Sequence, residues 1–379
     1  MAEAARARRE GRPGPVRVAL ACPYAWDSPG GVQVHVRELG ERLLGRGHQV
    51  LVLTPSRKRP AEPWVRAVGR PVEVPYNRST APIDPRPWSV RPVGRLLFAF
   101  RPDVVHAHEP FTPSTSMWAT LSSHAPVVAT FHSGAERSLL FDLSAPVLRR
   151  MARRIAVRIA VSERAAAFAR ARLGGEFRVV PNGLDVGSFA EAEPADLGPG
   201  RRLLFVGRLH RRKGFPVAVE AFRLLAEGRP DLRLIVAGDG EERAAAERLK
   251  PSVRDRVTML GTVPHDQLPR YYAACDLLVA PSVGGESFGY VLLEAMAGGL
   301  PVVASRIPGY DEIVRDGREG FLVPAGDPRA VADAAAKVLD DPALARTMAR
   351  AGRTTAAGYD WAAVAGQIEA VYREALALR

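Results

Sequence analysis

Short apolar, β-rich runs alternate with helix-like stretches along this chain, and the alternation occurs twice. Such βα units predict parallel sheets with helices on both faces, so the expected fold class is α/β. The expected strands are 16–22, 49–54, 104–108, 127–132 and 158–162 in the first series, with a helix at 32–44, and 202–207, 232–238, 257–261, 276–282, 301–305 and 320–324 in the second. Two Rossmann-like doubly wound domains facing a cleft would accommodate both series.

The two series give the expected domain boundaries. We expect one Rossmann-like domain at residues 16–183 and another at 184–359, with a Pro-, Gly- and acid-rich linker near 185–200. A C-terminal helix at 360–379 is expected to pack back on the first domain. Residues 1–15 lack the apolar centre of a signal peptide and are expected to form a disordered basic tail.

Composition excludes several classes. The 379 residues are 47% hydrophobic and 25% charged, which is typical of globular domains and excludes wholesale disorder. No apolar run approaches the roughly 18 residues that span a bilayer, so a cytoplasmic location is expected. Cys22 and Cys275 lie far apart in apolar sequence, which favours buried free thiols over a disulfide, and a zinc site would need more ligands.

The net charge of +12 is unevenly distributed. Residues 1–182 contain 28 Lys and Arg against 14 Asp and Glu, whereas residues 183–379 contain 25 against 27. This asymmetry indicates an anionic partner for the first half, either a membrane surface or nucleic acid. Because no recognised nucleic-acid motif is present, we expect no nucleic acid, although a nucleic-acid-binding protein remains an alternative.

The segment GGESFGYVLLEAMAGG at 284–299 contains two glutamates with different expected roles. Eight residues separate Glu286 from Glu294, so they would lie roughly 80° apart around a helix axis. We expect Glu286 in the loop, facing a reacting sugar, and Glu294 within the helix, accepting hydrogen bonds from ribose hydroxyls. Backbone amides at the helix start could bind a phosphate, namely those of Gly285, Ser287, Phe288 and Gly289. The alternative is a glycine-rich turn before an ordinary amphipathic helix.

The segment GRLHRRKG at 207–214 places Arg208 after an expected strand and Lys213 before an expected helix. Two cations at this position could neutralise a diphosphate leaving group. Only four of the 53 basic residues are lysine, so retention of Lys213 beside two arginines suggests a specific phosphate contact. The alternative is a solvated basic loop.

Two features of the first half remain ambiguous from residues alone. Pro29, Gly30 and Gly31 follow the first expected strand, where they could admit a diphosphate to a helix N-terminus or simply form a tight turn. The GxGxxG spacing of dinucleotide-binding proteins is absent, which weighs against a nicotinamide enzyme. His132 ends an expected strand, where it could be a structural histidine or a site residue.

A basic segment at 144–158 has the pattern of an interfacial amphipathic helix. Leu148, Met151 and Ile155 would form one apolar stripe. The flanking cations are Arg149, Arg150, Arg153 and Arg154, and a second membrane contact could come from Arg86, Trp88, Arg91 and Arg95. A core-packed helix with a solvated basic face is the alternative.

Several segments together carry a resemblance to a known family. They are CPYAWDSPGGVQVHV (22–36), VPYN (74–77), HEP (108–110), VVATFH (127–132), RIAVS (158–162), PNGLDV (181–186), the GR…RKG segment, GGESFG and YDW (359–361). On these residues the chain resembles retaining glycosyltransferases of the GT-B type and, within them, the actinobacterial phosphatidyl-myo-inositol mannosyltransferases. The similarity extends over nearly all of residues 16–372.

The resemblance implies transfer of mannose from GDP-mannose to the inositol ring of phosphatidylinositol, with retention of anomeric configuration. It implies a donor-binding second domain and an acceptor-binding first domain, at an anionic phospholipid membrane. No tightly bound cofactor is expected, and no visible protein site requires a divalent metal. The implied location is cytoplasmic, peripheral on the inner face of the plasma membrane.

The resemblance also implies roles for individual residues. Arg208 and Lys213 would stabilise the diphosphate, Glu286 would orient the sugar, and His132 would lie near the transferred sugar. The remaining implied contacts are Gly31 with the donor phosphate, the backbone near Val263 with the donor base, and Tyr24 and Gln33 with the inositol phosphate. The GR…RKG loop is one residue shorter than the family pattern, which leaves open whether Arg212 or Lys213 reaches the phosphate.

Other functions remain open at this point. A retaining glycosyltransferase could use another nucleotide sugar and a different lipid or small-molecule acceptor. A catalytically silent sugar-nucleotide-binding protein is also possible, and donor hydrolysis without acceptor would separate an enzyme from a binder.

Overall fold

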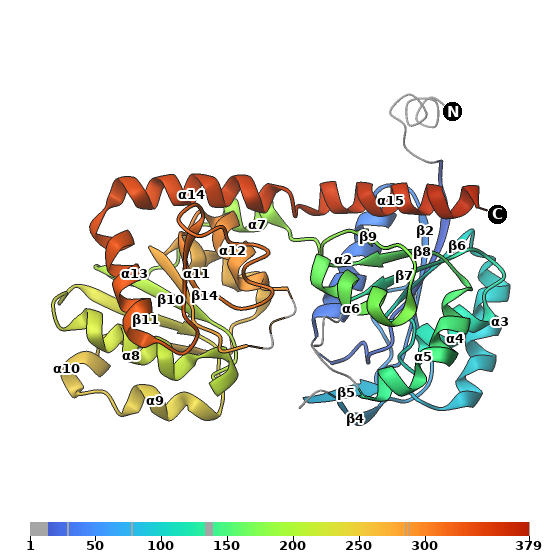
Figure 1. The fold of residues 1–379 in the computed structure, drawn as a ribbon, viewed down its shortest axis with the longest axis horizontal. Coiled ribbons are helices and arrows are strands. Elements are labelled where there is room, and N and C mark those ends of the chain that lie inside the picture. Colours follow the sequence, from blue (N-terminus) through green and yellow to red (C-terminus); the bar gives the residue numbers. More distant parts are fainter. Residues whose placement is uncertain are drawn as a thin grey trace. The chain divides into compact units, whose positions relative to one another are not determined.

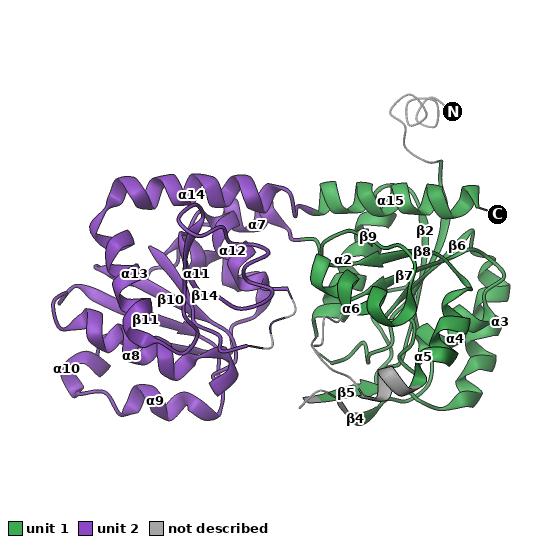
Figure 2. Cartoon of the chain, in the orientation of Figure 1, with its two compact units in different colours: residues 1–183, 361–379 green, residues 184–360 purple. Residues whose placement is uncertain are grey.

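The computed structural model describes residues 14–28, 30–76, 79–132, 139–284, 286 and 288–378. These residues form two compact units, shown in separate colours in Figure 2. Unit 1 combines Met1–Gly183 with Trp361–Arg379, and unit 2 is Leu184–Asp360. The expected basic tail falls largely outside the described residues.

Unit 1 is built on a parallel sheet with helices on both faces (Figure 1). Its strands are β1 (Arg17–Ala21), β2 (Gln49–Thr54), β3 (Val65–Ala67), β4 (Val72–Tyr76), β5 (Ser79–Ile83), β6 (Val104–His108), β7 (Val127–Phe131), β8 (Ile155–Ala160) and β9 (Arg178–Val179). Its helices are α2 (Gly31–Gly45), α3 (Val90–Phe100) after the 3₁₀ turn η1 (Pro87–Ser89), α4 (Thr115–Ser122), α5 (Leu139–Ala152), α6 (Glu163–Leu173) and α15 (Trp361–Ala377). Within the described residues the main sheet has the order β3-β2-β1-β6-β7-β8-β9.

The central strands of unit 1 are apolar on both faces because helices cover both sides of the sheet. All five residues of β6 and of β7 are buried, although β6 contains two histidines. Helix α2 buries positions that recur at helical spacing, and α15 packs on the same side of the sheet through Val364, Ile368 and Tyr372. The antiparallel hairpin β4–β5 interrupts the βα alternation and was not expected from the sequence.

Unit 2 contains a second parallel sheet, with the order β12-β11-β10-β13-β14-β15 among the described residues. Its strands are β10 (Arg201–Val206), β11 (Leu232–Ala237), β12 (Val257–Gly261), β13 (Leu277–Ala280), β14 (Val302–Ser305) and β15 (Gly320–Val323). Its α-helices are α7 (Val186–Ala190), α8 (Phe215–Ala226), α9 (Ala244–Glu247), α10 (Pro251–Arg254), α11 (Leu268–Ala273), α12 (Tyr290–Gly298), α13 (Pro328–Asp340) and α14 (Pro342–Ala357). Three 3₁₀ turns complete the description, η2 (Arg211–Lys213), η3 (Glu241–Arg243) and η4 (His265–Gln267).

Local sequence signals explain where the last helices of unit 2 begin. Asp327 and Asp341 cap α13 and α14, each accepting hydrogen bonds from two backbone N–H groups of the first turn, and a proline follows each cap. The expected linker at 185–200 is partly wrong, because it contains α7, whose Phe189 is buried in the core of unit 2. The predicted fold class, two Rossmann-like α/β sheets, is confirmed.

The expected continuous helix at 144–158 is wrong. Helix α5 ends at Ala152, and Ile155 begins strand β8, where it is buried. Leu148 also packs into the core of unit 1, so the apolar stripe is not available to a membrane. The four arginines of this segment are nevertheless exposed, and their membrane role stays a prediction.

Two further findings concern chemistry and membranes. Cys22 and Cys275 are buried free thiols, as predicted. Of the helices in the described part of the chain, none is long and apolar enough to cross a bilayer.

Candidate active site

In each unit the predicted site residues gather where the strand order reverses. In unit 2 this is the carboxyl end of β10 and β13, which pair in the sheet although they are distant in sequence. In unit 1 it is the carboxyl end of β1 and β6. Open parallel sheets bind ligands at this point because the connections leave it in opposite directions and open a crevice.

Glu286 lies at the centre of a polar cluster in unit 2. Its Oε1 is 2.8 Å from the Nζ of Lys213 and 3.4 Å from a guanidinium nitrogen of Arg212. The Ser282 hydroxyl donates a hydrogen bond of 3.1 Å to the same carboxylate. Lys213 also reaches Oε2 at 2.9 Å, so both carboxylate oxygens are engaged. The structure therefore brings together the predicted cation and the predicted carboxylate.

A close backbone approach fixes Lys213 in this cluster. Gly214 follows it with φ of +73°, and a Cβ at that position would lie 1.9 Å from the carbonyl oxygen of Pro281. Only glycine tolerates both the conformation and the contact. Gly214 thus holds the η2 turn against the end of β13, which explains why a residue 73 positions away in sequence can contact Glu286.

Arg208 and Val263 follow β10 and β12, two strands of the same sheet that are separated by β11. Arg208 is two residues beyond the end of β10 and is exposed. Val263 follows β12 and is half-buried, just before the η4 turn. Both are placed at the carboxyl edge, as their predicted contacts with diphosphate and base require.

Glu294 is buried within α12, where its Oε2 accepts a hydrogen bond of 2.6 Å from the Tyr272 hydroxyl. His265 lies 3.7 Å from the other oxygen. Burial raises the pKa of Glu294, and the hydrogen bond from Tyr272 opposes that rise. The sequence analysis missed both partners, because no pattern links positions 265 and 272 to this helix.

The loop before α12 is described at Phe288 and Gly289, whereas Gly285 and Ser287 lie outside the described residues. Gly289 has φ of +82° and caps α12, and a Cβ there would contact the ring of Tyr310 at 3.0 Å. The Phe288 side chain is buried against Tyr290 and Tyr359. Any ligand contact of Phe288 would therefore come from its backbone.

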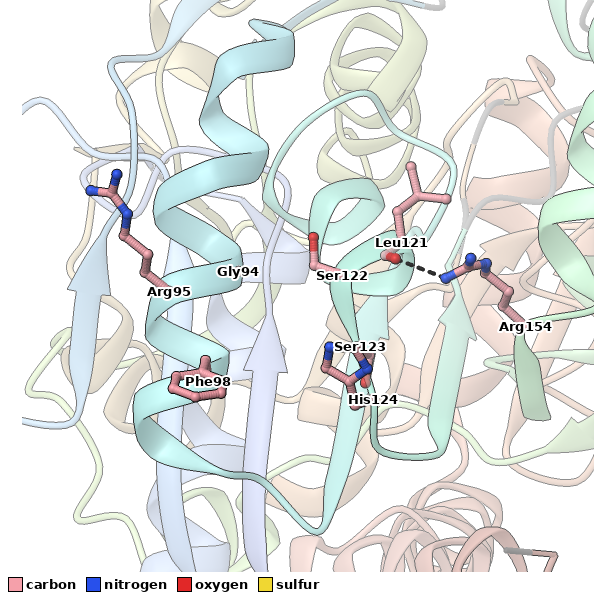
Figure 3. Close-up of a pocket in the computed structure, with 8 residues that line it drawn as sticks. All are labelled: Gly94, Arg95, Phe98, Leu121, Ser122, Ser123, His124 and Arg154. Carbon is pink, nitrogen blue, oxygen red and sulfur yellow. Dashed lines mark hydrogen bonds between the residues drawn. The ribbon is translucent and has the colours of Figure 1, made fainter.

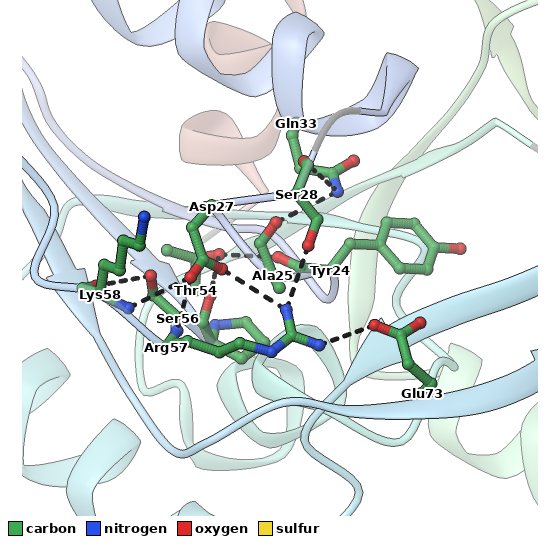
Figure 4. A network of polar contacts seen from close by, with 11 residues as sticks. Tyr24, Ala25, Asp27, Ser28, Gln33, Thr54, Ser56, Arg57, Lys58 and Glu73 are labelled. Carbon is green, nitrogen blue, oxygen red and sulfur yellow. Dashed lines mark hydrogen bonds and ion pairs between the residues drawn. The ribbon is translucent and has the colours of Figure 1, made fainter.

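In unit 1 the β1–α2 loop is organised by Gln33 (Figure 4). The Gln33 side chain is buried and donates to the carbonyl oxygens of Ala25 and Ser28, both at 3.2 Å. Its predicted partner Tyr24 is half-buried in the same loop. At the start of α2, a Cβ added to Gly31 would meet no atom within 4 Å, so this helix N-terminus opens onto free space.

A second network supports the same loop from the outside (Figure 4). The Asp27 carboxylate accepts hydrogen bonds from the backbone N–H groups of Arg57 and Lys58, at 3.1 and 3.2 Å. The Arg57 side chain donates to Ser28 at 3.2 Å and to Glu73 at 2.7 Å. Asp27 therefore holds the loop in place.

His132 lies one residue beyond β7 and is buried with His108, the last residue of β6. The His108 Nδ1 and His132 Nε2 atoms are 3.0 Å apart. Glu109 accepts a hydrogen bond of 2.8 Å from the backbone N–H of His132 and adopts a positive φ of 49°. Backbone strain of this kind concentrates at functional sites. His108 and Glu109 therefore hold the ends of β6 and β7 together through these contacts.

A pocket of about 610 Å³ lies in unit 1 between α3, the end of α4 and the turn before β8 (Figure 3). It is lined by Gly94, Arg95, Phe98, Leu121, Ser122, Ser123, His124 and Arg154. Arg154 donates a hydrogen bond of 2.8 Å to the carbonyl of Leu121. Phe98 is 74% exposed, so an aromatic side chain and two arginines share this surface. The structure joins here residues that the sequence assigned to separate membrane contacts.

The chain is similar to known proteins over nearly its full length. Residues 29–188 match the family described as Glycosyltransferase Family 4, and residues 192–355 match Glycosyl transferases group 1. The chain is 39% identical over 361 residues to the phosphatidyl-myo-inositol mannosyltransferase of Mycobacterium leprae, covering 94% of this chain and 96% of that protein. It is 31% identical over 405 residues to the D-inositol 3-phosphate glycosyltransferase of Acidothermus cellulolyticus, covering 95% and 89%.

A solved structure of another protein has a similar fold. Sucrose-phosphate synthase from Thermosynechococcus elongatus matches with a TM-score of 0.77 and 26% identity, covering 96% of this chain and 100% of that chain. The two Rossmann-like parallel sheets agree with the GT-B fold. The chain belongs to the glycosyltransferase family that includes the phosphatidyl-myo-inositol mannosyltransferases.

Proposed function

We propose that this enzyme transfers mannose from GDP-mannose to a hydroxyl of the inositol ring of phosphatidylinositol, with retention of anomeric configuration. The observation that carries the proposal is the cluster of Lys213, Arg212 and Glu286 at the strand reversal of unit 2. Full-length similarity to phosphatidyl-myo-inositol mannosyltransferases supports the choice of sugar and acceptor.

The cluster suits a sugar nucleotide because positively and negatively charged side chains lie side by side in it. A lysine ammonium has three donors. Glu286 accepts from two of them through its two oxygens, at 2.8 and 2.9 Å, which leaves one donor for a diphosphate oxygen. Arg208, exposed beyond β10, supplies a second cation. Fixed cations of this kind stabilise the charge that develops on the departing diphosphate.

Retention follows in the proposal from attack on the same face that the nucleotide leaves. The bond from the anomeric carbon to the diphosphate oxygen breaks, the acceptor hydroxyl oxygen bonds to that carbon, and the leaving phosphate takes the hydroxyl proton. Glu286 orients the sugar hydroxyls, and His132 of unit 1 steadies positive charge on the sugar. Glu294 accepts from the ribose through the oxygen that Tyr272 leaves available.

The acceptor is assigned to unit 1. The β1–α2 loop is assigned to the inositol phosphate, whereas Gly31 at the N-terminus of α2, where a Cβ would meet no atom within 4 Å, is assigned to the donor phosphate. Tyr24 belongs to the same loop, and Gln33 holds that loop in shape. The exposed Phe98 with Arg95 and Arg154 forms a surface that suits an anionic membrane at the inner face, because an aromatic ring enters the interface while arginines contact lipid phosphates.

A thermal-shift panel of nucleotide sugars tests the donor. At 100 times its dissociation constant a ligand stabilises a protein by about 2.7 kcal/mol, so GDP-mannose should raise the melting temperature more than UDP-glucose, UDP-mannose or GDP-glucose at equal concentration. Lys213→Ala should remove the shift, whereas Arg211→Ala, in the same turn, should retain it. A larger shift with a UDP-sugar would overturn the donor assignment.

A soluble inositol phosphate is the second candidate acceptor. The similarity to a D-inositol 3-phosphate glycosyltransferase favours it, and the inositol phosphate group is common to both acceptors. Co-sedimentation with vesicles of phosphatidylinositol and phosphatidylcholine distinguishes the two, with pure phosphatidylcholine vesicles as control. Binding that depends on the anionic lipid and falls on Phe98→Ser and Arg95→Ser supports the lipid, and equal recovery with both vesicles supports the soluble acceptor.

A further inference from the structure

Unit 1 contains a buried group of histidines that the proposed reaction only partly uses. His35 on α2, His108 at the end of β6 and His132 beyond β7 are 2%, 0% and 8% exposed. One ring nitrogen from each lies within 4.8 Å of one from each of the others. No spacing in the sequence connects these three positions, which is why the sequence analysis found no metal site.

Some buried ring nitrogens in this group of histidines have no hydrogen-bond partner among the described residues. Neither ring nitrogen of His35 has a hydrogen-bond partner among the described residues, and the Nε2 of His108 also has none. The neighbouring His106 shows the opposite arrangement, since its ring nitrogens lie 2.8 Å from the Tyr372 hydroxyl and 2.7 Å from the Thr130 hydroxyl. Because a buried polar group without a partner is costly and rare, the unpartnered imidazoles indicate a ligand that completes them.

From this geometry we propose that His35, His108 and His132 bind one divalent transition-metal ion of the zinc class. Three imidazole nitrogens are a common zinc ligand set, with bonds of about 2.0–2.1 Å. Tetrahedral ligands at that length are about 3.3 Å apart, which is inside the 4.8 Å limit within which the three ring nitrogens already lie. The proposal concerns unit 1 alone and does not depend on which acceptor the enzyme uses.

The residues around the three histidines keep the rings neutral and include a candidate for a further metal ligand. Burial lowers the pKa of His35 and His108 well below its ordinary value, and that of His132 to about 4, so all three rings are neutral and able to ligate at pH 7. The side chain of Asn182 interacts with His132, and its buried Oδ1 has no hydrogen-bond partner in the described structure. This oxygen is the candidate fourth ligand.

Bound metal would tie α2 to the carboxyl ends of β6 and β7. The helix that carries His35 also carries Gln33, a residue assigned to the acceptor. Trp361 of α15 lies against His35, with ring centroids 5.1 Å apart, and helps to enclose the site. Metal would therefore act as a structural element that positions the acceptor loop.

The test uses the full chain without a histidine tag, treated with chelator and dialysed. Titration with Co²⁺ should give the visible absorption bands of tetrahedral nitrogen coordination, saturating at one equivalent, and Zn²⁺ should abolish them. Elemental analysis after incubation with Zn²⁺ and gel filtration should give one zinc per chain. A flat Co²⁺ spectrum together with less than about 0.1 equivalent of retained zinc would overturn the proposal.

Variants assign the ligands. His35→Gln and His108→Gln should each weaken zinc binding by more than the roughly 10- to 100-fold that loss of an outer-shell partner costs. His124→Gln, at an exposed histidine, is the matched control and should bind one zinc as wild type does. Circular dichroism confirms folding of each variant. If both ligand variants fold and bind zinc like wild type, the assigned site is wrong, and the wild-type Co²⁺ spectrum decides the question even if a variant fails to fold.

Discussion

The polar groups at the strand reversal of unit 2 are paired with one another, whereas those at the strand reversal of unit 1 are buried and partly unpartnered. Glu286 has Lys213, Arg212 and Ser282 around its carboxylate. His35 has no hydrogen-bond partner in the described structure. The two sheets therefore have the same architecture but different polar groups at the strand reversal. Unit 2 has charged side chains that pair with one another, and unit 1 has neutral imidazoles.

The difference predicts opposite responses to mutation. Removing a member of a paired cluster leaves its partners uncompensated, so the change should cost activity or stability. Removing an imidazole that has no partner relieves a desolvation cost and should cost little in metal-free protein. The predictions below test this contrast, from the largest expected effect to the smallest.

Glu286→Gln is expected to have the largest effect. The amide loses the charge that holds Lys213 and orients the sugar, so transfer should fall about 1,000-fold, the upper range for loss of one preorganised electrostatic contact. GDP affinity, measured by calorimetry, should stay within a few-fold, whereas Arg208→Ala should weaken both. Wild-type turnover in Glu286→Gln would remove the carboxylate from the reaction.

Gln33→Ala should affect only the acceptor side. Loss of the two bonds from Gln33 to the loop carbonyls should lower transfer to phosphatidylinositol by about 10- to 100-fold, since a small displacement of a positioning loop is costly. Donor hydrolysis without acceptor should be unchanged, because the cations and glutamates assigned to the donor belong to unit 2. If both activities fell together, Gln33 would be needed for folding of unit 1 and not for the acceptor.

Glu369→Gln tests whether the effect of a mutation depends on charge pairing or on the unit in which the residue lies, because it breaks a charge pair inside unit 1. Glu369 Oε1 lies 2.7 Å from Arg46 and 3.2 Å from His48, joining α15 to α2 and the start of β2. Removing a partner from a fully buried pair costs about 3–5 kcal/mol, and partial exposure of Arg46 reduces this to about 2 kcal/mol. Urea unfolding at pH 7 measures the change, and a loss below about 0.5 kcal/mol would contradict it.

The same pair has a defined pH dependence. Burial alone would raise the pKa of Glu369, but hydrogen bonds from His48 and Arg46 outweigh it and hold the pKa below its ordinary 4.5. The stabilisation is therefore complete above about pH 4.5 and is lost as the pH falls through the lower folded value. The stability difference between wild type and Glu369→Gln should shrink over this acid range, and a difference that stays constant down to pH 3 would disprove the linkage.

His35→Leu should have the smallest effect in metal-free protein. Leucine has a similar volume and removes two unpartnered nitrogens, so the free energy of unfolding should change by less than about 1 kcal/mol or increase. Urea unfolding with excess chelator measures it, with His106→Leu as control, which should lose about 2 kcal/mol because Thr130 and Tyr372 lose a partner. Equal losses in both variants would remove the contrast between the two clusters.

The fold class could be predicted from the sequence, because the alternation of apolar, strand-like runs with helix-like stretches, together with the composition, specifies parallel βα units. The sequence also predicted Lys213 and Glu286, since short motifs place both beside strand ends. It could not find Tyr272, His265 or the Arg57 network, because these contacts depend on how separate elements pack. The helix expected at 144–158 failed for a related reason: the apolar spacing of Leu148, Met151 and Ile155 suits a helix, but tertiary packing begins a strand at Ile155.

The histidine cluster shows the same limit more sharply. His35, His108 and His132 come from three elements, and only the strand order β1-β6-β7 brings those elements together. Each histidine alone has the pattern of an ordinary buried residue. Their convergence becomes visible only in three dimensions.

The central claim is the transfer reaction itself, and product analysis tests it most directly. Purified enzyme is incubated with GDP-mannose and phosphatidylinositol vesicles, and the lipid product is examined by mass spectrometry and by NMR of the anomeric proton. The account predicts one added hexose on the inositol ring, in the α configuration of the donor, with no product from UDP-glucose or from Glu286→Gln. A β-linked product would contradict retention, and transfer from UDP-glucose with none from GDP-mannose would contradict the proposed function.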